Sequence, residues 1–292
     1  MKDVTLRQEL NELTQETFGF DFEDWVTNGY YEGDYIPYSY EENGHLIANV
    51  SVNQMRFIQL GVEKYYIQLG TVMTRKEFRN RGYARKLIKS TLADYAGKCD
   101  GIYLFGNIST LEFYDKMGFF RGMQYRYILK DDIRIESQNR ANERNEADCF
   151  QLVNPKEPLH KDNYMKTVRF SAVNAALEQK NKYGLQMFYT SDMEQVYYSS
   201  KLDCYVVMEV QKHTLYLKSI ICTKRIQLDQ ILTYIQKKYD TMILGFAPCL
   251  EDTFMFVSQI YDGEDDYRLF IYGEELENIK TKKLYFPEFS HA

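Results

Sequence analysis

The residues best suited to chemistry lie in a basic, glycine-containing turn over residues 75–86, between a strand-like run and a helix-like run. Backbone N–H groups at the start of a helix have no helical partner, and together with the positive end of the helix dipole they bind anions. Gly82 allows close approach of a phosphate. Fixed positive charge surrounds the turn at Arg79, Arg81, Arg85 and Lys86. The pattern predicts a site for a ligand with more than one phosphate; the alternative is a basic turn without a ligand.

Strands and helices must hold this turn in place, and apolar periodicity predicts them in alternation. An amphipathic helix is expected over residues 4–17, followed by an aromatic and acidic loop over 18–40. The next expected elements are strands at 46–52, 55–60 and 65–73, a helix at 84–95, a strand at 101–106, a helix at 110–117 and a strand at 125–129. This order is typical of an α/β fold with a mixed (α+β) sheet.

The apolar pattern fails between Asp131 and Asp148, which predicts a linker or a solvated edge. We therefore expect one domain over residues 1–132, a polar linker over 133–148 and a second domain over 149–292. Within the second domain we expect a strand at 149–153, a helix at 162–182, strands at 196–199, 205–210 and 214–221, a helix at 228–239 and an apolar run at 242–247. This order echoes that of the first half.

Two motifs of the first half resemble those of the GNAT (general N-acetyltransferase) superfamily. The family's R/Q-x-x-G-x-G/A motif is matched by Arg79, Gly82 and Ala84, and the strand signature V-x-T before it by Val72 and Thr74. Downstream, Asn107 ends the apolar strand, and residues 113–119 (FYDKMGF) are similar to the family's F-Y-x-x-x-G-F. The resemblance covers roughly residues 1–130. It implies a GNAT-type N-terminal domain whose first strand is absent or displaced.

The resemblance also implies acetyl-CoA as the co-substrate and a role for each matching residue. The pyrophosphate is expected on the turn, at Arg79, Asn80, Arg81, Gly82, Tyr83 and Ala84. The pantetheine arm is expected along the strand at Val72, Met73 and Thr74, where a backbone N–H can stabilise the oxyanion of the thioester carbonyl. Asn107 is expected to hold an amide of the cofactor, and Tyr114 to protonate the leaving thiolate. The alternative for Tyr114 is a packed aromatic side chain.

A general base is harder to assign. An alkyl amine with a pKa of about 10.4 must lose a proton before it attacks. Where family members with a base on the central strand carry Glu, this sequence has Gln68. The options are a water chain to Glu63 or Glu77, a substrate amine of low pKa, or a loop acid among Glu23, Asp24, Glu32 and Asp34. Together with Trp25, Tyr30, Tyr31 and Tyr35, those acids suggest a cleft for a cationic amine; the alternative is a solvated face.

The second half lacks the phosphate-binding pattern, because residues 223–229 read TKRIQLD without a glycine. We interpret it as a degenerate GNAT-like domain that binds no cofactor. Such a domain is expected to pack on the first, to shape the acceptor site or to form a homodimer.

Composition limits the partners and the location. A formal charge of −6 and a pI near 5.4 argue against a broad nucleic-acid-binding surface. No signal peptide and no membrane span is expected. Four histidines argue against a histidine-rich metal site, and the five cysteines, odd in number and widely spaced, are expected to be reduced and mostly buried. These features predict a cytoplasmic protein.

The leading hypothesis is an acetyl-CoA-dependent N-acetyltransferase that acts on the amine of a small molecule or a peptide. Direct attack of the amine on the thioester is the expected mechanism. One alternative is a non-catalytic acyl-CoA-binding or sensor protein, which would explain Gln68. Another is a binding module for a different phosphorylated ligand.

Overall fold

The first of two mixed sheets holds the turn singled out above. The structure is a computed structural model that describes residues 1–264 and 266–291. The strands of the first sheet follow the order β1 (Tyr35–Glu42), β2 (His45–Gln59), β3 (Val62–Thr74), β4 (Gly101–Gly106), β14 (Arg268–Tyr272) and β5 (Phe120–Arg121), with β8 (Leu177–Gln179) also paired to β2. Among the described pairs of this sheet, only β3 and β4 are parallel.

The second sheet repeats this arrangement of strands. Its order is β13 (Phe256–Tyr261), β6 (Gln124–Leu129), β12 (Thr241–Leu244), β11 (Thr214–Ile221), β10 (Cys204–Gln211), β9 (Val196–Ser199) and β7 (Gln151–Leu152). Here β11 and β12 are parallel, and β11 follows β10 in an antiparallel hairpin, as β3 follows β2. The expected mixed α/β fold is confirmed, with one mixed sheet in each half of the fold.

The two sheets exchange strands. β14 comes from the C-terminal part of the chain but lies between β4 and β5 of the first sheet. β6, predicted as the last strand of the first domain, pairs instead with β12 and β13 of the second sheet. The placement of that strand from sequence is therefore wrong, because a strand's own residues do not specify which sheet receives it.

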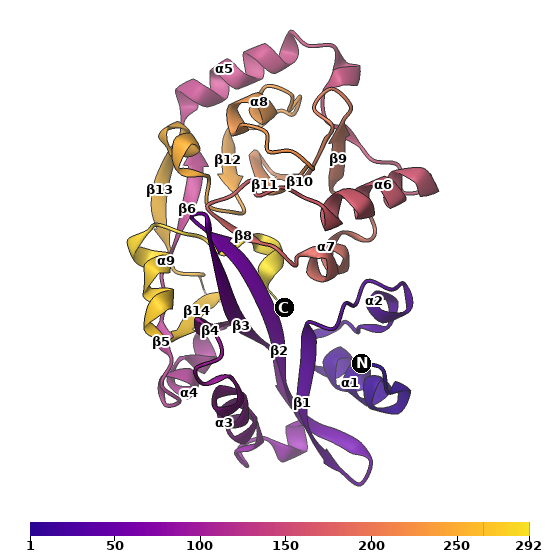
Figure 1. Ribbon diagram of the computed structural model, residues 1–292, viewed down its shortest axis with the longest axis vertical. Coiled ribbons are helices and arrows are strands. Elements are labelled where there is room, and N and C mark those ends of the chain that lie inside the picture. Colours follow the sequence, from indigo (N-terminus) through magenta and orange to yellow (C-terminus); the bar gives the residue numbers. More distant parts are fainter. Residues whose placement is uncertain (265, 292) are drawn as a thin grey trace.

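Helices cover both faces of the first sheet. Figure 1 shows α1 and α2 on one side of β1–β3, and α3 and α4 on the other. The helices are α1 (Val4–Phe18), α2 (Glu23–Thr27), α3 (Tyr83–Tyr95), α4 (Leu111–Asp115), α5 (Asp131–Asn142), α6 (Pro158–Arg169), α7 (Tyr183–Thr190), α8 (Leu228–Leu232) and α9 (Asn278–Thr281). Short 3-10 turns are η1 (Lys76–Phe78), η2 (Ile108–Thr110), η3 (Glu146–Asp148), η4 (Leu250–Met255), η5 (Glu274–Glu277) and η6 (Glu288–Ser290). Within residues 1–264 and 266–291, none of the helices has the length and apolar character that a membrane span needs.

The C-terminal segment, residues 284–291, runs between the two sheets. The Tyr103 hydroxyl of the first sheet donates to the Ser290 carbonyl at 3.1 Å, and the Glu288 amide donates to the Gly245 carbonyl beside the second sheet at 2.8 Å. The Phe286 ring stacks on Tyr103 with centroids 4.1 Å apart. This segment therefore joins the two halves into one buried core.

Several elements differ from the sequence predictions. Residues 18–40 contain α2 and the start of β1, an edge strand that carries Pro37 and shows little apolar alternation. The runs at 46–52 and 55–60 belong to one strand, β2, because the polar Asn53 between them is buried and hydrogen-bonded to Gln68 of β3. The polar stretch after Asp131 includes a helix, α5.

In the second half, the helix expected at 162–182 is wrong. Residues 158–169 form α6, but β8 and the start of α7 follow. The helix expected at 228–239 is the short α8, which ends at Leu232. The strands expected at 196–199 and 214–221 are confirmed as β9 and β11. All five cysteines are free thiols, and Cys149, Cys204 and Cys222 are buried.

Candidate active site

The candidate site begins where β3 and β4 separate. These parallel strands are paired from Tyr66 and Gly101 to Leu69 and Leu104. Beyond Leu69, β3 continues to Thr74 and pairs only with β2 on its other side. The backbone of residues 70–74 therefore has one edge without a partner strand among the described residues, as an extended ligand requires.

A β-bulge fixes the backbone at this opening. Gly70 pairs with Ser51 and Met73 with Asn49, so that Thr71 and Val72 together face one residue of β2. Thr71 has a φ of +41°. Its hydroxyl donates to Ser51 Oγ at 2.7 Å and lies 2.7 Å from the hydroxyl of Tyr35, while Asn49 Nδ2 donates to the Thr71 carbonyl at 3.1 Å. This buried network holds the bulge in a conformation that a β-branched residue rarely adopts.

The turn predicted to bind phosphate leads from β3 into α3. Gly82 precedes the helix with a φ of +83°, and no side chain caps the free N–H groups of the first turn. A Cβ built on Gly82 would meet no atom within 4 Å, so the site is open. The first helical hydrogen bond runs from the Lys86 amide to the Gly82 carbonyl. The open, uncapped amides before that bond, at Tyr83, Ala84 and Arg85, suit an anion.

The basic side chains around this turn form no salt bridge to described residues; they are Arg79, Arg81, Arg85 and Lys86, all exposed. Arg81 lies over the Phe78 ring at 5.1 Å, and Arg79 Nε donates to the Thr74 carbonyl at 3.1 Å. Asn80, also in the turn, has a left-handed φ of +63°. The fixed charge at the turn is therefore available to a phosphate.

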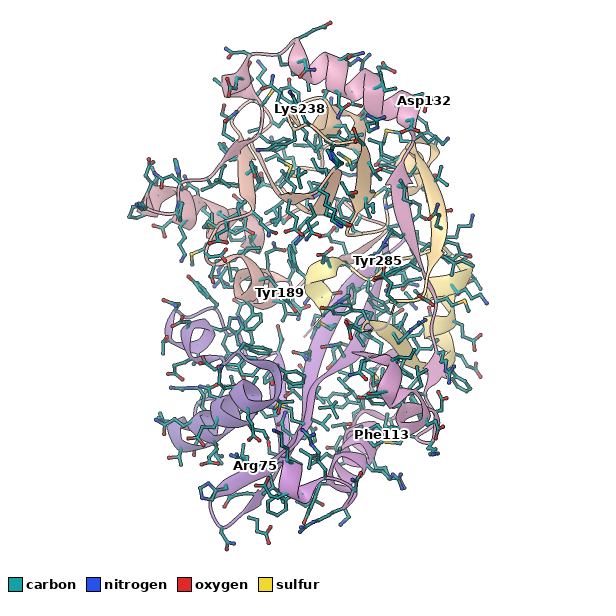
Figure 2. All side chains as sticks on the ribbon, turned by 180° about the vertical axis from the view of Figure 1, so that it is seen from behind. Arg75, Phe113, Asp132, Tyr189, Lys238 and Tyr285 are labelled. Carbon is teal, nitrogen blue, oxygen red and sulfur yellow. The ribbon has the colours of Figure 1, made fainter. Side chains whose placement is uncertain are left out.

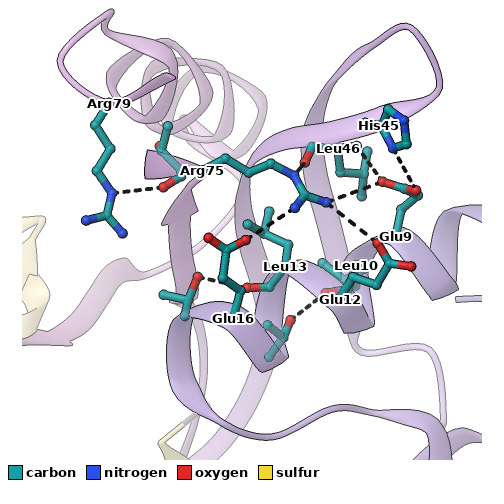
Figure 3. A network of polar contacts seen from close by, with 12 residues as sticks. Glu9, Leu10, Glu12, Leu13, Glu16, His45, Leu46, Arg75 and Arg79 are labelled. Atoms are coloured by element: carbon teal, nitrogen blue, oxygen red, sulfur yellow. Dashed lines mark hydrogen bonds and ion pairs between the residues drawn. The ribbon is translucent and has the colours of Figure 1, made fainter. Parts of the chain in front are cut away.

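Arg75 has a different role from the arginines of the turn. Its guanidinium binds the Leu46 carbonyl at 2.8 Å and faces three carboxylates of α1, those of Glu9, Glu12 and Glu16 (Figure 3). Only 18% of its side chain is exposed. Arg75 thus fastens α1 to the start of β2, and its charge is compensated within the protein.

Tyr114 lies in α4, within the helix expected at 110–117. Its ring packs on Phe270 of β14 with centroids 4.9 Å apart and lies against Gly106, where a Cβ would come within 3.1 Å of Cε2. Burial raises the pKa of Tyr114 well above its usual range. The side chain is buried, with 4% of its surface exposed, and its hydroxyl bonds no described residue.

Asn107 follows β4 on the same side of the opening. Its Oδ1 accepts hydrogen bonds from the Ser109 amide at 3.1 Å and from the Ser109 hydroxyl at 2.6 Å. The side chain therefore caps η2, while its Nδ2 donates to no described residue. Only this NH2 group is free for the predicted contact with a cofactor carbonyl.

The candidate general bases differ in how close they lie to the opening. Gln68 is buried, and its Oε1 accepts from Asn53 Nδ2 at 2.8 Å. Glu63 lies ten residues before Met73 along β3, roughly 30 Å away, and pairs with Lys180. Glu77 is exposed in η1, close after β3. Glu63 is therefore too remote to act near Met73, whereas Glu77 lies near the opening.

The acids of the aromatic loop are mostly paired. Glu23 is bound by Arg7 at 3.0 Å, which lowers the pKa of its carboxyl, and Glu32 pairs with Arg169. Asp34 accepts from Asn181 Nδ2 at 2.9 Å; burial nevertheless raises the pKa of Asp34. Asp24 is exposed. This loop does not present a set of free acids to a ligand.

Beside the bulge is an aromatic cavity of about 290 Å³, lined by Thr71, Phe20, Phe22, Trp25, Tyr35, Leu185, Phe188 and Tyr189. The last three belong to α7 of the second half. Trp25 Nε1 donates to the Gly184 carbonyl at 2.7 Å, which fixes α7 against the loop. The expected packing of the second domain on the first is thus confirmed. Sequence reasoning found the loop aromatics but missed α7, whose residues carry no local signal for this site.

The second sheet has no equivalent of the phosphate turn. β11 ends at Ile221, and the segment before α8 contains no glycine and leads into a helix of only five residues. Arg225 of this segment pairs with Glu251 and Asp252. The residues that would have to bind a pyrophosphate are absent or engaged elsewhere.

Comparison with models of protein families gives a match in the first half of the chain. Residues 5–119 match the model of the acetyltransferase (GNAT) family. A search of the curated proteins finds no match.

Solved structures match almost the whole chain. A GCN5-related N-acetyltransferase from Kribbella flavida is 12% identical over 95% of this chain and 71% of its own, with a TM-score of 0.56. Eis1 from Mycobacterium abscessus is 13% identical over 92% and 72%, with a TM-score of 0.54. A probable N-acyltransferase from Enterococcus faecalis is 16% identical over 94% and 71%, with a TM-score of 0.53. The chain therefore has a two-domain GNAT fold.

Proposed function

We propose that this protein transfers an acetyl group from acetyl-CoA to the amine of a small molecule or peptide. One observation supports the proposal: β3 and β4 stop pairing at Leu69 and Leu104, so the unpaired edge of residues 70–74 leads directly into the open turn before the uncapped start of α3. Acetyl-CoA supplies an activated acyl group as its thioester. The residues present fit its phosphates and its extended arm.

Each of these groups has a chemical task. Amides of the α3 start and Arg79, Arg81 and Arg85 bind the pyrophosphate. The backbone of Val72–Thr74 orients the arm, and a backbone N–H near Met73 stabilises negative charge on the thioester oxygen. Tyr114 donates a proton to the leaving sulfur. Because burial keeps the pKa of Tyr114 high, its phenol stays protonated at neutral pH and can serve as an acid.

The aromatic cavity beside Thr71 is the proposed acceptor site. An ammonium group loses solvation among Phe22, Trp25 and Phe188, and this lowers its pKa toward the neutral, nucleophilic form. The cavity itself thus favours deprotonation, and a water-linked Glu77 can receive the proton. This combines two of the options that the sequence leaves for a missing base at Gln68.

The alternative function is a non-catalytic acyl-CoA sensor. It is favoured by Gln68, which is buried and hydrogen-bonded and cannot take up a proton. Turnover separates the two functions, because a sensor binds acetyl-CoA without releasing the thiol.

The decisive experiment is a calorimetric titration of acetyl-CoA, followed by thiol release with a panel of primary amines on the same preparation. Wild type is expected to bind and to turn over at least one amine. Gly82→Asp should not bind, whereas Gly97→Asp, at another open left-handed glycine just past α3, should bind like wild type. Binding without turnover supports the sensor. No binding by wild type contradicts both functions.

The predicted homodimer, the cytoplasmic location and the absence of nucleic-acid and membrane partners stay predictions.

A further inference from the structure

A second cavity lies on the second sheet, outside the proposed catalytic opening. It measures about 570 Å³ and is bounded by β6, β10, β11, β12, β13, α7 and the C-terminal segment. Figure 2 shows Tyr189 and Tyr285, two of its lining residues, near the middle of the molecule. A volume of this size is sufficient for a small organic ligand.

The polar floor of the cavity contains one compensated charge pair. Lys218 Nζ lies 3.0 Å from Glu209 Oε1 and from Gln195 Oε1. Glu209 also accepts from the amides of Gln195 and Gln211, each at 2.6 Å. Lys218 and Glu209 therefore satisfy each other and leave no free charge for a ligand.

The other carboxylates of the cavity lining outnumber its remaining cations. Arg126 pairs with Glu264 at 3.5 Å, but Glu288 has only a 3.6 Å contact with the same Lys218. Burial raises the pKa of Glu288, and Lys218 only partly opposes this. Asp192 and Glu194 are exposed at the rim and form no salt bridge to described residues. The lining thus has five carboxylates against two fixed cations, so positive charge is favoured inside it.

Aromatic rings and one unpaired nitrogen complete the lining. The rings belong to Tyr189, Tyr216, Tyr261, Tyr267, Tyr285 and Phe289. His291 Nε2 is buried and has no hydrogen-bond partner among the described residues. Burial lowers the pKa of His291 to about 3, so the imidazole is neutral and Nε2 can accept a proton donor. Rings and a neutral acceptor suit alkylammonium groups with methylene chains.

A metal ion fits this cavity less well than an organic cation. Metal ions require several ligands within about 2.6 Å of one point, and the described residues contain no group of three or more His, Cys, Asp or Glu that could hold one. The free carboxylates are instead distributed around the cavity. Distributed charge matches a ligand whose positive groups are themselves separated.

The cavity also adjoins the proposed acceptor site, because Tyr189 lines both cavities. The hydroxyl of Tyr189 donates to the His291 carbonyl at 2.6 Å, which fixes the ring between α7 and the C-terminal segment. An extended ligand with several amine nitrogens that passes Tyr189 would place one nitrogen near Thr71 and the others in the acidic cavity.

We propose that this cavity binds a linear organic polycation, with ammonium groups near Glu288, Asp192 and Glu194 and methylene groups against the tyrosine rings. The assignment of this ligand as the acceptor amine rests on the proposed function. Its binding to the cavity does not.

The test is a calorimetric titration of spermine into the full chain without acetyl-CoA. The variants are Glu288→Gln and the double variant Asp192→Asn/Glu194→Gln, which remove charge with little change of shape. The matched control is Glu136→Gln on α5, an exposed carboxylate paired with Arg140 outside the cavity. Thermal unfolding of each variant checks that the fold is retained.

We expect spermine to bind wild type and Glu136→Gln alike and to bind Glu288→Gln about tenfold or more weakly, with a smaller loss for the rim variant. Butylamine, with one ammonium group, should bind far more weakly than spermine. Absence of spermine binding, or equal affinity in all variants, would overturn the proposal.

A further variant separates this proposal from the catalytic one. Gly82→Asp should lose acetyl-CoA but bind spermine like wild type, since Gly82 lies outside the cavity lining. If spermine binds the cavity but is not acetylated, the cavity assignment stands and only its role as acceptor site fails. Loss of spermine binding in Gly82→Asp would contradict an independent site.

Discussion

Each sheet has an opening where its parallel strand pair ends. The strands around the two openings are arranged alike, but the segments that follow them differ. In the first sheet the parallel pair β3/β4 ends at Leu69 and Leu104, and a bulge at Thr71 follows. In the second sheet the parallel pair β11/β12 ends at Leu217 and Leu244. The next residue of β11, Lys218, has no pairing partner in β10, because the register of the β10/β11 pair shifts there. The two sheets thus provide the same backbone framework for a cleft.

The segment after each parallel strand pair decides the chemistry of its opening. The first pair leads into a glycine turn and a helix of thirteen residues, whereas the second leads into a glycine-free segment and a helix of five. The second opening also contains the C-terminal segment, whose Glu288 amide binds the Gly245 carbonyl. A repeated fold therefore does not repeat a cofactor site, because that site depends on the turn and the helix start.

The largest expected effect comes from placing an aspartate in each turn. Gly82→Asp should weaken acetyl-CoA binding more than 100-fold, by charge repulsion and by strain at a φ of +83°. Lys224→Asp, an exposed change in the second turn, should leave affinity unchanged. Calorimetry should also give one acetyl-CoA per chain. A stoichiometry of two would mean that the second opening also binds acetyl-CoA, which contradicts the difference between the two sheets.

A smaller effect is expected when only the proposed proton donor is removed. Tyr114→Phe should lower kcat about 100-fold and leave acetyl-CoA affinity near that of wild type. Tyr125→Phe, on the second sheet, should leave both values unchanged and serves as the control. Normal turnover in Tyr114→Phe would show that another group protonates the sulfur.

The pH profile gives a third test. A phenol with an ordinary pKa near 10 loses its proton as the pH approaches that value. Since burial raises the pKa of Tyr114 well above 10, the acid form should persist, and the rate should not fall between pH 9 and 10. The measurement is kcat against pH with saturating substrates. A decline centred near 10 in wild type, absent from Tyr114→Phe, would indicate an unshifted Tyr114.

The smallest effects concern the structural arginines that follow each parallel strand. Arg75→Ala should reduce the free energy of unfolding by about 1–3 kcal/mol, because it removes the donor to the Leu46 carbonyl and the ion pairs with Glu9, Glu12 and Glu16 (Figure 3). Arg225→Ala should cost less than about 1 kcal/mol, because its side chain is 41% exposed. Urea denaturation measures both. Equal losses would contradict the difference in burial.

The candidate site was largely predictable from local sequence. Local periodicity and glycine placement indicated the strand before the turn, Gly82 at the start of α3 and the helix that contains Tyr114, whereas the role of Tyr114 was implied by the resemblance to the GNAT superfamily. The roles of Arg75 and Gln68 were not predictable, because each depends on partners from other elements: the acids of α1 and Asn53 of β2. The same holds for α7 in the aromatic cavity, more than a hundred residues from Thr71.

The fold class was predictable from the sequence, but the assignment of strands to the two sheets was less so. The mixed sheets follow from strand and helix periodicity, whereas the edge strand β1, with Pro37, gives little alternation to detect. The exchange of β6 and β14 depends on pairing between strands far apart in the sequence, which local sequence patterns do not reveal.

The exchanged strand β14 also bears on how the protein is made. Synthesis proceeds from the N-terminus, and domains generally fold as they emerge. The first sheet, however, receives residues 268–272 between β4 and β5. Phe270 of this strand packs on Tyr114. The first sheet is therefore completed only after residues 268–272 have been synthesised, so a chain truncated before them lacks the strand that packs on Tyr114.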